Sequence, residues 1–398
     1  MQLYDKDLLS MQEVRELVEA AKEAQKELAN MTQSQVDHIV RAIADAGVRN
    51  ARRLAEMAHE DTGFGRVEDK IIKNIFGSRG VYEYIKDMKT VGELDRDDVK
   101  KVRTIAVPVG VIAGLIPSTN PTSTALYKAE IAIKAGNAIV FSPHPTALRC
   151  IMETVKVIRQ AIAEAGGNEN LVSCITIPTM EATDNLMRHR DVAMILATGG
   201  SAMVRAAYSS GTPAIGVGPG NGPAYLEKTC DLPKAVKRIL DSKTFDNGTI
   251  CASEQSIICD EDMAPAVQAE MEKQGAYFLD DAEREKLGKF ILRANGTMNP
   301  EIVGRSVETI AKLAGLDNVP ATARVLVARE DGVGRGHPYS NEKLGPILAF
   351  YTGTDYKDVC DKVCTILRYE GAGHTFSMHT KDDDMVDYFA KRVPASRV

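Results

Sequence analysis

Short apolar runs alternate with helical segments between residues 104 and 217. The runs are IAVPVGVIAGLI (105–116), AIVFS (138–142), LVSCITI (171–177), VAMILA (192–197) and PAIGV (213–217), and the helical segments are 122–135, 146–165, 180–190 and 201–210. Runs rich in Val, Ile and Leu are typical of parallel strands that are buried on both faces. Their alternation with helices predicts right-handed crossovers and a doubly wound sheet.

A second α/β series follows residue 228. Asp231 is placed to cap a helix whose first turn contains a proline. The predicted strands are EQSIICD (254–260), ARVLVAR (323–329), PILAFYT (346–352) and HTFSMHT (374–380), followed by a helical stretch at 381–392. The pattern predicts an α/β protein with two parallel-sheet domains, residues 1–227 and 228–398. Because the chain ends soon after the last helix, we expect further residues in the native protein.

The region before the first sheet contains no motif that indicates chemistry. Residues 11–92 read as polar-faced helices, and the charged stretch ELDRDDVKKVR (93–103) fits either a solvated hairpin or a loop. Hydrophobic residues make up 44% and charged residues 26% of the chain, which is ordinary for a globular protein.

Charge and cysteine usage exclude several classes of protein. A net charge of −6 provides no field that would attract nucleic acid. No apolar run could span a membrane, and the N-terminus lacks a secretory signal, so we expect a cytoplasmic protein. The seven cysteines are irregularly spaced, and no metal-binding pattern accompanies the pair Cys360 and Cys364. The sequence therefore predicts neither a disulfide framework nor a metal site.

Four segments are candidates for a functional site, and each also has a structural explanation. Cys251 follows a glycine-containing turn and precedes a strand, a placement that suits a nucleophile or a structural cysteine. Asn120 follows the strand 105–116, where its amide could stabilise an oxyanion or cap a helix. Gly199 and Gly200 form a strand-to-helix turn that could face a cofactor. The segment GVGPGNG (216–222) indicates special backbone angles or a close approach to a ligand.

Taken together and in order, these segments resemble the aldehyde dehydrogenase superfamily. The resemblance is carried by IPSTNPTST around Asn120, FSPHP (141–145), GVGPGNGP (216–223), SKTFDNGTICASEQS around Cys251, EKLGPIL (342–348) and GHT (373–375). It covers nearly the whole chain and is strongest to the CoA-acylating branch. It implies an NAD-binding domain, a catalytic domain and a small oligomerisation hairpin at about 93–107.

The resemblance also implies roles for individual residues. Cys251 matches the catalytic cysteine, Asn120 the oxyanion-hole residue, and His374 a histidine typical of the acylating branch, where it is either catalytic or merely packed. Ser142 stands where hydrolytic relatives have a lysine near the adenosine ribose, so NAD rather than NADP is expected but not fixed. The implied cofactor-binding positions are Ile116, Pro117, Ser142, Thr198, Gly199, Gly200, Val217, Glu342 and Leu344.

One departure from the family pattern bears on the reaction. Hydrolytic members have a glutamate general base where this chain has Gly216. Water is a poor nucleophile without a base, whereas a thiol with a pKa near ~8.5 needs less help. The resemblance therefore implies NAD-dependent oxidation of a short aldehyde, acetaldehyde or propionaldehyde, with CoA as acyl acceptor. A homo-oligomer, and association with a bacterial microcompartment, are further expectations. The alternatives are a hydrolytic aldehyde dehydrogenase and a non-enzymatic scaffold.

Overall fold

The computed structural model describes residues 4–293 and 296–398, which form two compact units. The first unit comprises the chain through Gly63 together with Val67–Val217, and the second comprises Phe64–Arg66 together with Gly218–Val398. Within the described ranges, no helix combines the length and the apolar character that crossing a bilayer requires.

The first unit contains a five-stranded sheet in the order β5-β4-β3-β6-β7, and every neighbouring pair is parallel. Its strands are β3 (Val111–Ile116), β4 (Ala138–Pro143), β5 (Val172–Cys174), β6 (Val192–Thr198) and β7 (Ala214–Val217). This order confirms the predicted series of crossovers. The chain reverses direction across the sheet between β3 and β6, which is the position where such sheets bind ligands.

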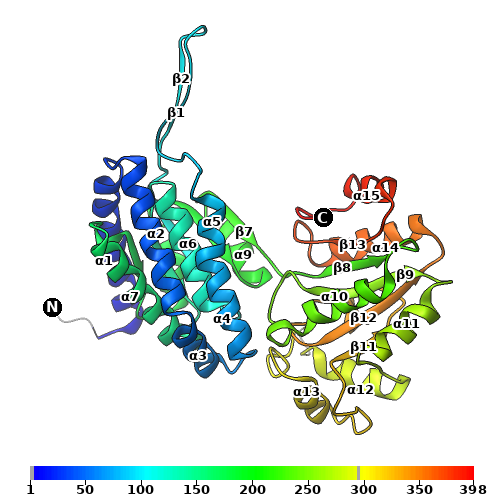
Figure 1. Cartoon of the computed structure of the whole chain (residues 1–398). Coiled ribbons are helices and arrows are strands. Elements are labelled where there is room, and N and C mark those ends of the chain that lie inside the picture. The colour runs from blue at the N-terminus through cyan, green and yellow to red at the C-terminus, as the bar shows by residue number, and fades with distance from the viewer. Residues whose placement is uncertain (1–3, 294–295) are drawn as a thin grey trace. The chain divides into compact units, whose positions relative to one another are not determined.

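Helices cover the first sheet and share one core with it (Figure 1). They are α1 (Lys6–Leu28), α2 (Gln33–Arg49), α3 (Ala51–Thr62), α4 (Val67–Ile75), α5 (Val81–Ile85), α6 (Pro121–Lys134), α7 (Leu148–Glu164), α8 (Met180–Met187) and α9 (Ser201–Tyr208). A π-helical turn, η1 (Phe76–Gly80), joins α4 to α5. Helices α2, α3, α6 and α7 pack together, while α1 packs with α8 and with β4.

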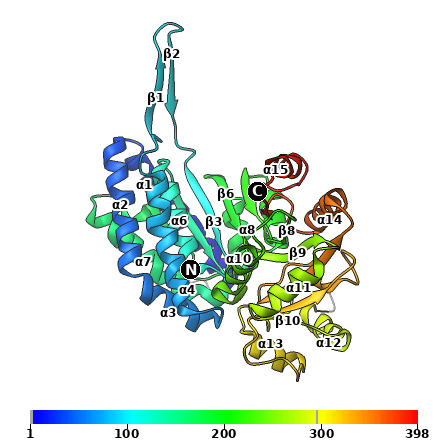
Figure 2. The same ribbon diagram turned by 45° about the vertical axis from the view of Figure 1, so that its right-hand side comes forward.

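The charged stretch before the first sheet forms an antiparallel hairpin. Strand β1 (Gly92–Asp97) pairs with β2 (Val102–Ala106), and the hairpin projects away from the helices of its own unit in both views (Figures 1 and 2). The predicted strand 105–116 was therefore wrong as a single element. Its first residues complete the hairpin, and Pro108 and Gly110 separate them from β3, because a proline cannot donate a ladder hydrogen bond.

The second unit contains a six-stranded parallel sheet in the order β10-β11-β12-β9-β8-β13. Its strands are β8 (Gly222–Leu226), β9 (Glu254–Asp260), β10 (Ala276–Phe278), β11 (Val325–Arg329), β12 (Ile347–Gly353) and β13 (Ser377–His379). Its helices are α10 (Leu232–Thr244), α11 (Ala264–Lys273), α12 (Asp281–Ile291), α13 (Val307–Ala314), α14 (Tyr356–Tyr369) and α15 (Asp383–Ala390).

Alternate residues of these strands enter two different cores. Ile257 and Cys259 pack with α10 and α11, whereas Ile258 between them packs with the core of α12, α13, α14 and α15. Likewise, Leu348 and Phe350 lie in the core with α10 and α11, whereas Ala349 between them lies in the other core. Because both faces are covered by helices, the strands read as continuous apolar runs. This arrangement confirms the predicted second α/β layer.

The structure places the division between the units earlier than the sequence does. The predicted boundary was 227/228, whereas the second unit begins again at Gly218. The reason is β8, an element that the sequence analysis did not identify as a strand. It pairs with both β9 and β13, so its backbone belongs to the second sheet. The predicted helix cap at Asp231 is confirmed, because its side chain accepts from the Lys234 amide.

Candidate active site

In the first unit, the candidate residues gather at the carboxyl edge of the sheet. Ile116 ends β3 and is followed by Pro117, while Ser142 is the second-last residue of β4. Thr198 and Val217 end β6 and β7, which pair with each other at these two residues. Because the strands are parallel, all these ends meet along one edge. The motifs of the sequence indicate these residues, but only the strand order shows that they are neighbours.

Asn120 occupies the N-cap position of α6, but its side chain does not cap the helix. Instead, Lys73 Nζ on α4 donates to Asn120 Oδ1 at 2.8 Å, and Asn120 Nδ2 donates to Thr119 Oγ1 at 3.1 Å. Helix α4 is itself tied to α6, since Thr122 Oγ1 donates to Asn74 Oδ1 at 2.7 Å. The ammonium group therefore fixes the orientation of the amide and leaves its NH₂ group as the donor. The helix-cap interpretation of Asn120 is wrong.

The turn after β6 leaves room beside its backbone. Gly200 caps α9 with φ −65°, and a Cβ added there would meet nothing within 4 Å. Gly199 N donates to Val217 O at 3.4 Å, which joins this turn to the end of β7. A helix N-terminus with free amides beside open space suits an anionic or polar ligand group.

Two residues at the same edge face neighbouring helices. The buried Ser142 hydroxyl hydrogen-bonds Thr183 Oγ1 on α8 at 2.8 Å. A Cβ on Gly216 would stand 2.7 Å from Val204 Cγ1 and 2.9 Å from Tyr208 Cε2, both on α9. A side chain at position 216 would therefore have to displace α9 side chains before it could reach a ligand.

A buried lysine holds two central strands of this sheet together. Lys128 Nζ donates to the carbonyls of Leu115 on β3 and Leu196 on β6, each at 2.8 Å. Burial lowers the pKa of Lys128 to about 7. The sequence analysis missed this residue because a lysine in an amphipathic helix reads as solvent-exposed.

In the second unit, the candidate residues lie at the opposite kind of edge, where the parallel strands begin. Cys251 stands three residues before β9, and His374 three residues before β13. Gly220 stands two residues before β8, and Glu342 stands five before β12. Since β12, β9, β8 and β13 are consecutive neighbours, these four segments converge at one edge of one sheet.

Cys251 is half-buried and follows an unusually constrained turn. Asp246, Asn247 and Gly248 all have left-handed backbones, with φ of 50°, 50° and 75°. The buried Asp246 carboxylate compensates for this strain, because it accepts from Thr249 Oγ1 at 2.7 Å and from the Arg66 amide at 2.7 Å. The turn thus delivers the thiol at a fixed position before the buried strand β9.

Gly220 and Glu342 pack directly behind this turn. A Cβ on Gly220 would stand 1.7 Å from the carbonyl oxygen of Cys251, so only glycine fits. Gly220 N donates to Glu342 Oε1 at 2.8 Å. Burial raises the pKa of the Glu342 carboxyl to about 8, although the Gly220 hydrogen bond opposes the shift.

Buried lysines support the EKLGP segment that carries Glu342. Lys243 Nζ donates to Gln255 Oε1 at 2.8 Å and to Lys343 O at 2.9 Å. Lys343 Nζ donates to the carbonyls of Tyr339 and Asn341, and burial lowers its pKa to about 7. Leu344 N approaches Met298 Sδ at 3.4 Å. Sequence reasoning missed this support because its members lie up to about a hundred residues apart.

The His374 ring is held by the neighbouring residue Thr375. Its Nδ1 lies 2.9 Å from Thr375 Oγ1, and Arg397 donates to the same hydroxyl at 3.0 Å. A Cβ on Gly222, the first residue of β8, would stand 3.1 Å from Thr375 O. Within the described part of the chain, His374 Nε2 is buried and lacks a hydrogen-bond partner. Burial, and next the charge of Arg397, lower the pKa of His374, which favours the neutral ring.

Comparison with known proteins identifies the fold. The model of the aldehyde dehydrogenase family matches residues 4–293. A probable aldehyde dehydrogenase from Listeria monocytogenes is 62% identical, with a TM-score of 0.97 over 99% of this chain and 87% of that one. An acetylating aldehyde dehydrogenase from Geobacillus thermoglucosidasius is 50% identical, with a TM-score of 0.96 over the same shares.

Curated relatives include longer, bifunctional proteins. The bifunctional aldehyde-alcohol dehydrogenase of Escherichia coli is 43% identical over 97% of this chain, which spans 43% of that protein. The chain therefore covers less than half the length of the aldehyde-alcohol dehydrogenases it matches. The family match, the two parallel sheets and the order of the motifs agree, and the chain belongs to the aldehyde dehydrogenase family.

Proposed function

We propose that this chain catalyses the NAD-dependent, CoA-acylating oxidation of a short-chain aldehyde. The observation that carries the proposal is the placement of Cys251, a half-buried thiol that a strained and fully bonded turn holds at the start of β9. A strained turn lowers the stability of the fold, so it is expected where it holds a side chain, here the Cys251 thiol, in a functional position. A propionaldehyde dehydrogenase of Rhodopseudomonas palustris, 31% identical, is described with bound CoA and an acylated cysteine.

In this proposal, the Cys251 thiolate attacks the aldehyde carbon and forms the new C–S bond. The negative charge passes to the aldehyde oxygen, to which Asn120 Nδ2 donates a hydrogen bond because Lys73 holds the amide oxygen away. Loss of hydride from the same carbon leaves a thioester on Cys251. The thiol of CoA then attacks that thioester, releases acyl-CoA and returns the cysteine.

The residues at the carboxyl edge of the first sheet fit a dinucleotide, which would supply the hydride acceptor. The open space beside Gly200 and the start of α9 suit its polar groups. Ile116, Pro117, Ser142, Thr198, Gly199, Val217, Glu342 and Leu344 are the remaining positions that we assign to its binding. NAD is our first choice and NADP the alternative, because Ser142 offers no positive charge for a ribose phosphate.

The choice of CoA over water rests on position 216. Hydrolysis needs a base that activates water, and this chain has a glycine whose neighbours are Val204 and Tyr208. The experiment is NADH formation from acetaldehyde and NAD with and without CoA. We expect continuous turnover with CoA and about one NADH per active site without it. Equal steady rates in both arms, with acetate as product, would overturn the proposal in favour of a hydrolytic enzyme.

We also propose that the hairpin of β1 and β2 joins copies of this chain into a homodimer or larger oligomer. An isolated two-stranded hairpin is marginally stable in water, and this one exposes apolar side chains on its strands, in its turn and just after it. The exposed residues are Leu94, Val99, Val102, Ile105 and Val107. Sedimentation velocity of Ile105→Lys should show smaller species than the parent, whereas Leu313→Lys, an exposed apolar control on α13, should not. An unchanged sedimentation coefficient for Ile105→Lys would remove the hairpin from the interface.

A further inference from the structure

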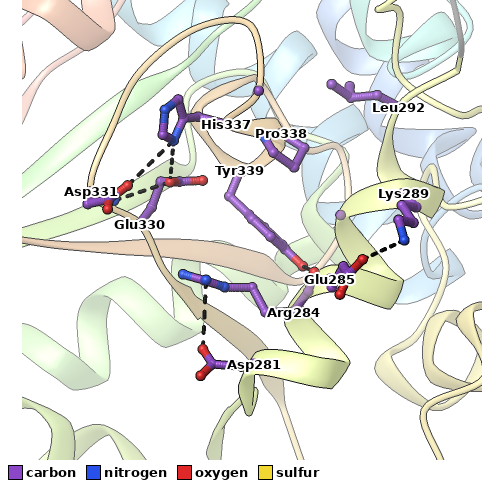
Figure 3. Close-up of a pocket in the computed structure, with 12 residues that line it drawn as sticks. Asp281, Arg284, Glu285, Lys289, Leu292, Glu330, Asp331, His337, Pro338 and Tyr339 are labelled. Carbon is purple, nitrogen blue, oxygen red and sulfur yellow. Dashed lines mark hydrogen bonds and ion pairs between the residues drawn. The ribbon is translucent and has the colours of Figure 1, made fainter.

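Three potential metal ligands meet in the loop between β11 and the short helix η5 (Pro338–Ser340) (Figure 3). His337 Nδ1 lies 2.7 Å from Glu330 Oε1 and 3.6 Å from Asp331 Oδ1. One ligand atom from each of the three residues lies within 4.8 Å of the other two. Among the described residues, no other group of three His, Cys, Asp or Glu side chains meets this condition. The cluster lies within the second unit and involves none of the residues assigned to the aldehyde reaction.

The basic side chains of the surrounding cavity do not pair with the two carboxylates of the cluster. The three residues line a cavity of about 680 Å³, which also contains Arg284 and Lys289. Those two basic side chains face other acids, since Arg284 lies 3.7 Å from Asp281 and Lys289 lies 2.5 Å from Glu285 (Figure 3). In the described chain, no Lys or Arg forms an ion pair with Glu330 or Asp331. Among the described residues, the only basic side chain that contacts both carboxylates is the His337 imidazole.

Glu330 is a nearly buried carboxylate whose partners are the His337 ring and the Asp331 amide. The Glu330 side chain is only 7% exposed, and a buried carboxylate destabilises a protein unless it is paired or coordinates a metal. The Asp331 side chain, in contrast, is 93% exposed. The cluster therefore combines one anchored carboxylate with one that solvent reaches, which gives an ion a path of entry.

The backbone holds the ligands in place. Asp331 N donates to Glu330 Oε1 at 3.1 Å, and Tyr351 OH donates to Gly332 O at 3.1 Å. The His337 ring lies so close to Gly332 that a Cβ there would stand 2.3 Å from two of its ring atoms. A larger residue at position 332 would push the imidazole away from the carboxylates. The cluster thus depends on a glycine at this position.

We propose that Glu330, Asp331 and His337 bind one divalent transition-metal ion. An imidazole nitrogen with two carboxylate oxygens suits zinc, nickel or a similar ion better than magnesium or calcium, which prefer oxygen ligands alone. Metal–ligand bonds of about 2.0–2.2 Å place neighbouring ligands roughly 3.3–3.6 Å apart around a tetrahedral zinc ion and roughly 2.8–3.1 Å apart around a square or octahedral nickel ion. The His337–Asp331 pair, at 3.6 Å, and the His337–Glu330 pair, at 2.7 Å, therefore need to move by several tenths of an ångström at most to hold either ion. Water from the cavity completes the coordination.

The ion would brace the loop that leads to Glu342. From the cluster, Gly334 N donates to Ser340 Oγ at 3.0 Å, and Ser340 O accepts from Asn221 Nδ2 at 2.6 Å. Lys343 Nζ binds the carbonyl of Tyr339 at 2.5 Å. The site therefore stabilises the segment from β11 to the EKLGP motif, and it takes no part in the chemical step. The proposed metal site does not depend on the proposed aldehyde reaction.

The test is calorimetric titration of the reduced, metal-free chain with Ni²⁺. We expect one high-affinity ion per chain and a rise in melting temperature, because the ion binds only the folded state. His337→Ala should weaken binding by at least about tenfold, as loss of a ligand does. Asp331→Asn should weaken it too, and since Asp331 is exposed, that variant keeps its fold. His38→Ala, which removes an exposed histidine from α2, is the matched control and should bind like the parent.

The outcomes separate cleanly. Binding lost in His337→Ala and weakened in Asp331→Asn, but kept in His38→Ala, supports the site. Equal affinity in all four proteins means that the ion binds elsewhere, for instance at a thiol, and overturns the proposal. A parent that shows no Ni²⁺ binding, or that binds Mg²⁺ as tightly as Ni²⁺, also overturns it.

Discussion

The two sheets present their candidate functional residues at opposite edges. In the first unit they follow the strands, at the carboxyl edge of β4, β3, β6 and β7. In the second unit they precede the strands, at the amino edge of β12, β9, β8 and β13. The first arrangement is the usual ligand-binding edge of a doubly wound sheet, and the second is not.

This difference determines what each edge can supply. Where a strand leads into a helix, the backbone amides of the helix N-terminus lie at the edge as hydrogen-bond donors, and Asn120 adds its side-chain amide there. A loop that leads into a strand has no helix N-terminus, so the loop itself must position the side chains. The second edge therefore relies on left-handed turns, a close glycine contact and buried lysines to position the Cys251 thiol and the Glu342 carboxyl. Variants at the two edges should accordingly fail in different ways.

The largest effect is expected at the thiol. Cys251→Ala should reduce CoA-dependent NADH formation by at least about a thousandfold, because no bond to the aldehyde carbon can form. Cys230→Ala, which removes another half-buried thiol of the same unit, should retain parental activity. Both proteins should have the parental circular dichroism spectrum. Substantial activity in Cys251→Ala would assign the nucleophile to another residue.

A smaller loss is expected at the first edge. Asn120→Ala should lower kcat by roughly 10²–10³-fold, as removal of one oxyanion donor does, and leave the Kd for NADH nearly unchanged. Lys73→Met should lower kcat less, since it frees the amide to rotate but does not remove it. Parallel measurement of kcat and NADH affinity separates the two contributions. If Lys73→Met reduces NADH affinity but not kcat, the lysine serves the cofactor and does not orient Asn120.

The two edges should also differ in their tolerance of a methyl group. Gly220→Ala places a Cβ 1.7 Å from the Cys251 carbonyl and should destabilise the protein by about 1–3 kcal/mol or more. Gly200→Ala meets only open space with φ −65°, and its cost should stay within about 1 kcal/mol. Urea denaturation of both variants measures this difference. Equal destabilisation would contradict the view that Gly220 is packed more closely than Gly200.

The smallest effect concerns pH and Glu342. Its pKa is raised from 4.5 to about 8, so the folded state holds a proton that the unfolded state loses across this window. The contribution of Glu342 to stability therefore falls as pH rises from 4.5 to about 8. Glu342→Gln removes this contribution, and its melting temperature relative to the parent should rise by a few degrees between pH 5 and pH 9. A constant difference would show that Glu342 is ionised in the folded protein.

Local patterns accounted for most of the fold. Apolar runs identified the strands that are long and buried on both faces, such as β4 and β9, because a central parallel strand has no polar face. They missed β8 and β10, which are short and rich in glycine or aromatic residues, and they merged β2 with β3. Those elements are strands because neighbouring strands form backbone hydrogen bonds with them. Such pairing cannot be predicted from a short stretch of sequence.

By itself, the sequence determined that this chain has two parallel α/β layers and a cysteine that follows a glycine-containing turn, because periodicity and turn chemistry are local properties. Only the tertiary structure decided how the candidate residues are held. Lys73 binds the Asn120 amide oxygen and so orients the amide, Gly220 packs against the backbone of Cys251, and His337 contacts Glu330 across a loop. Each of these contacts joins residues whose meeting depends on how the chain folds back on itself. A contact of that kind follows from the packing of whole elements, and no spacing along the chain encodes it.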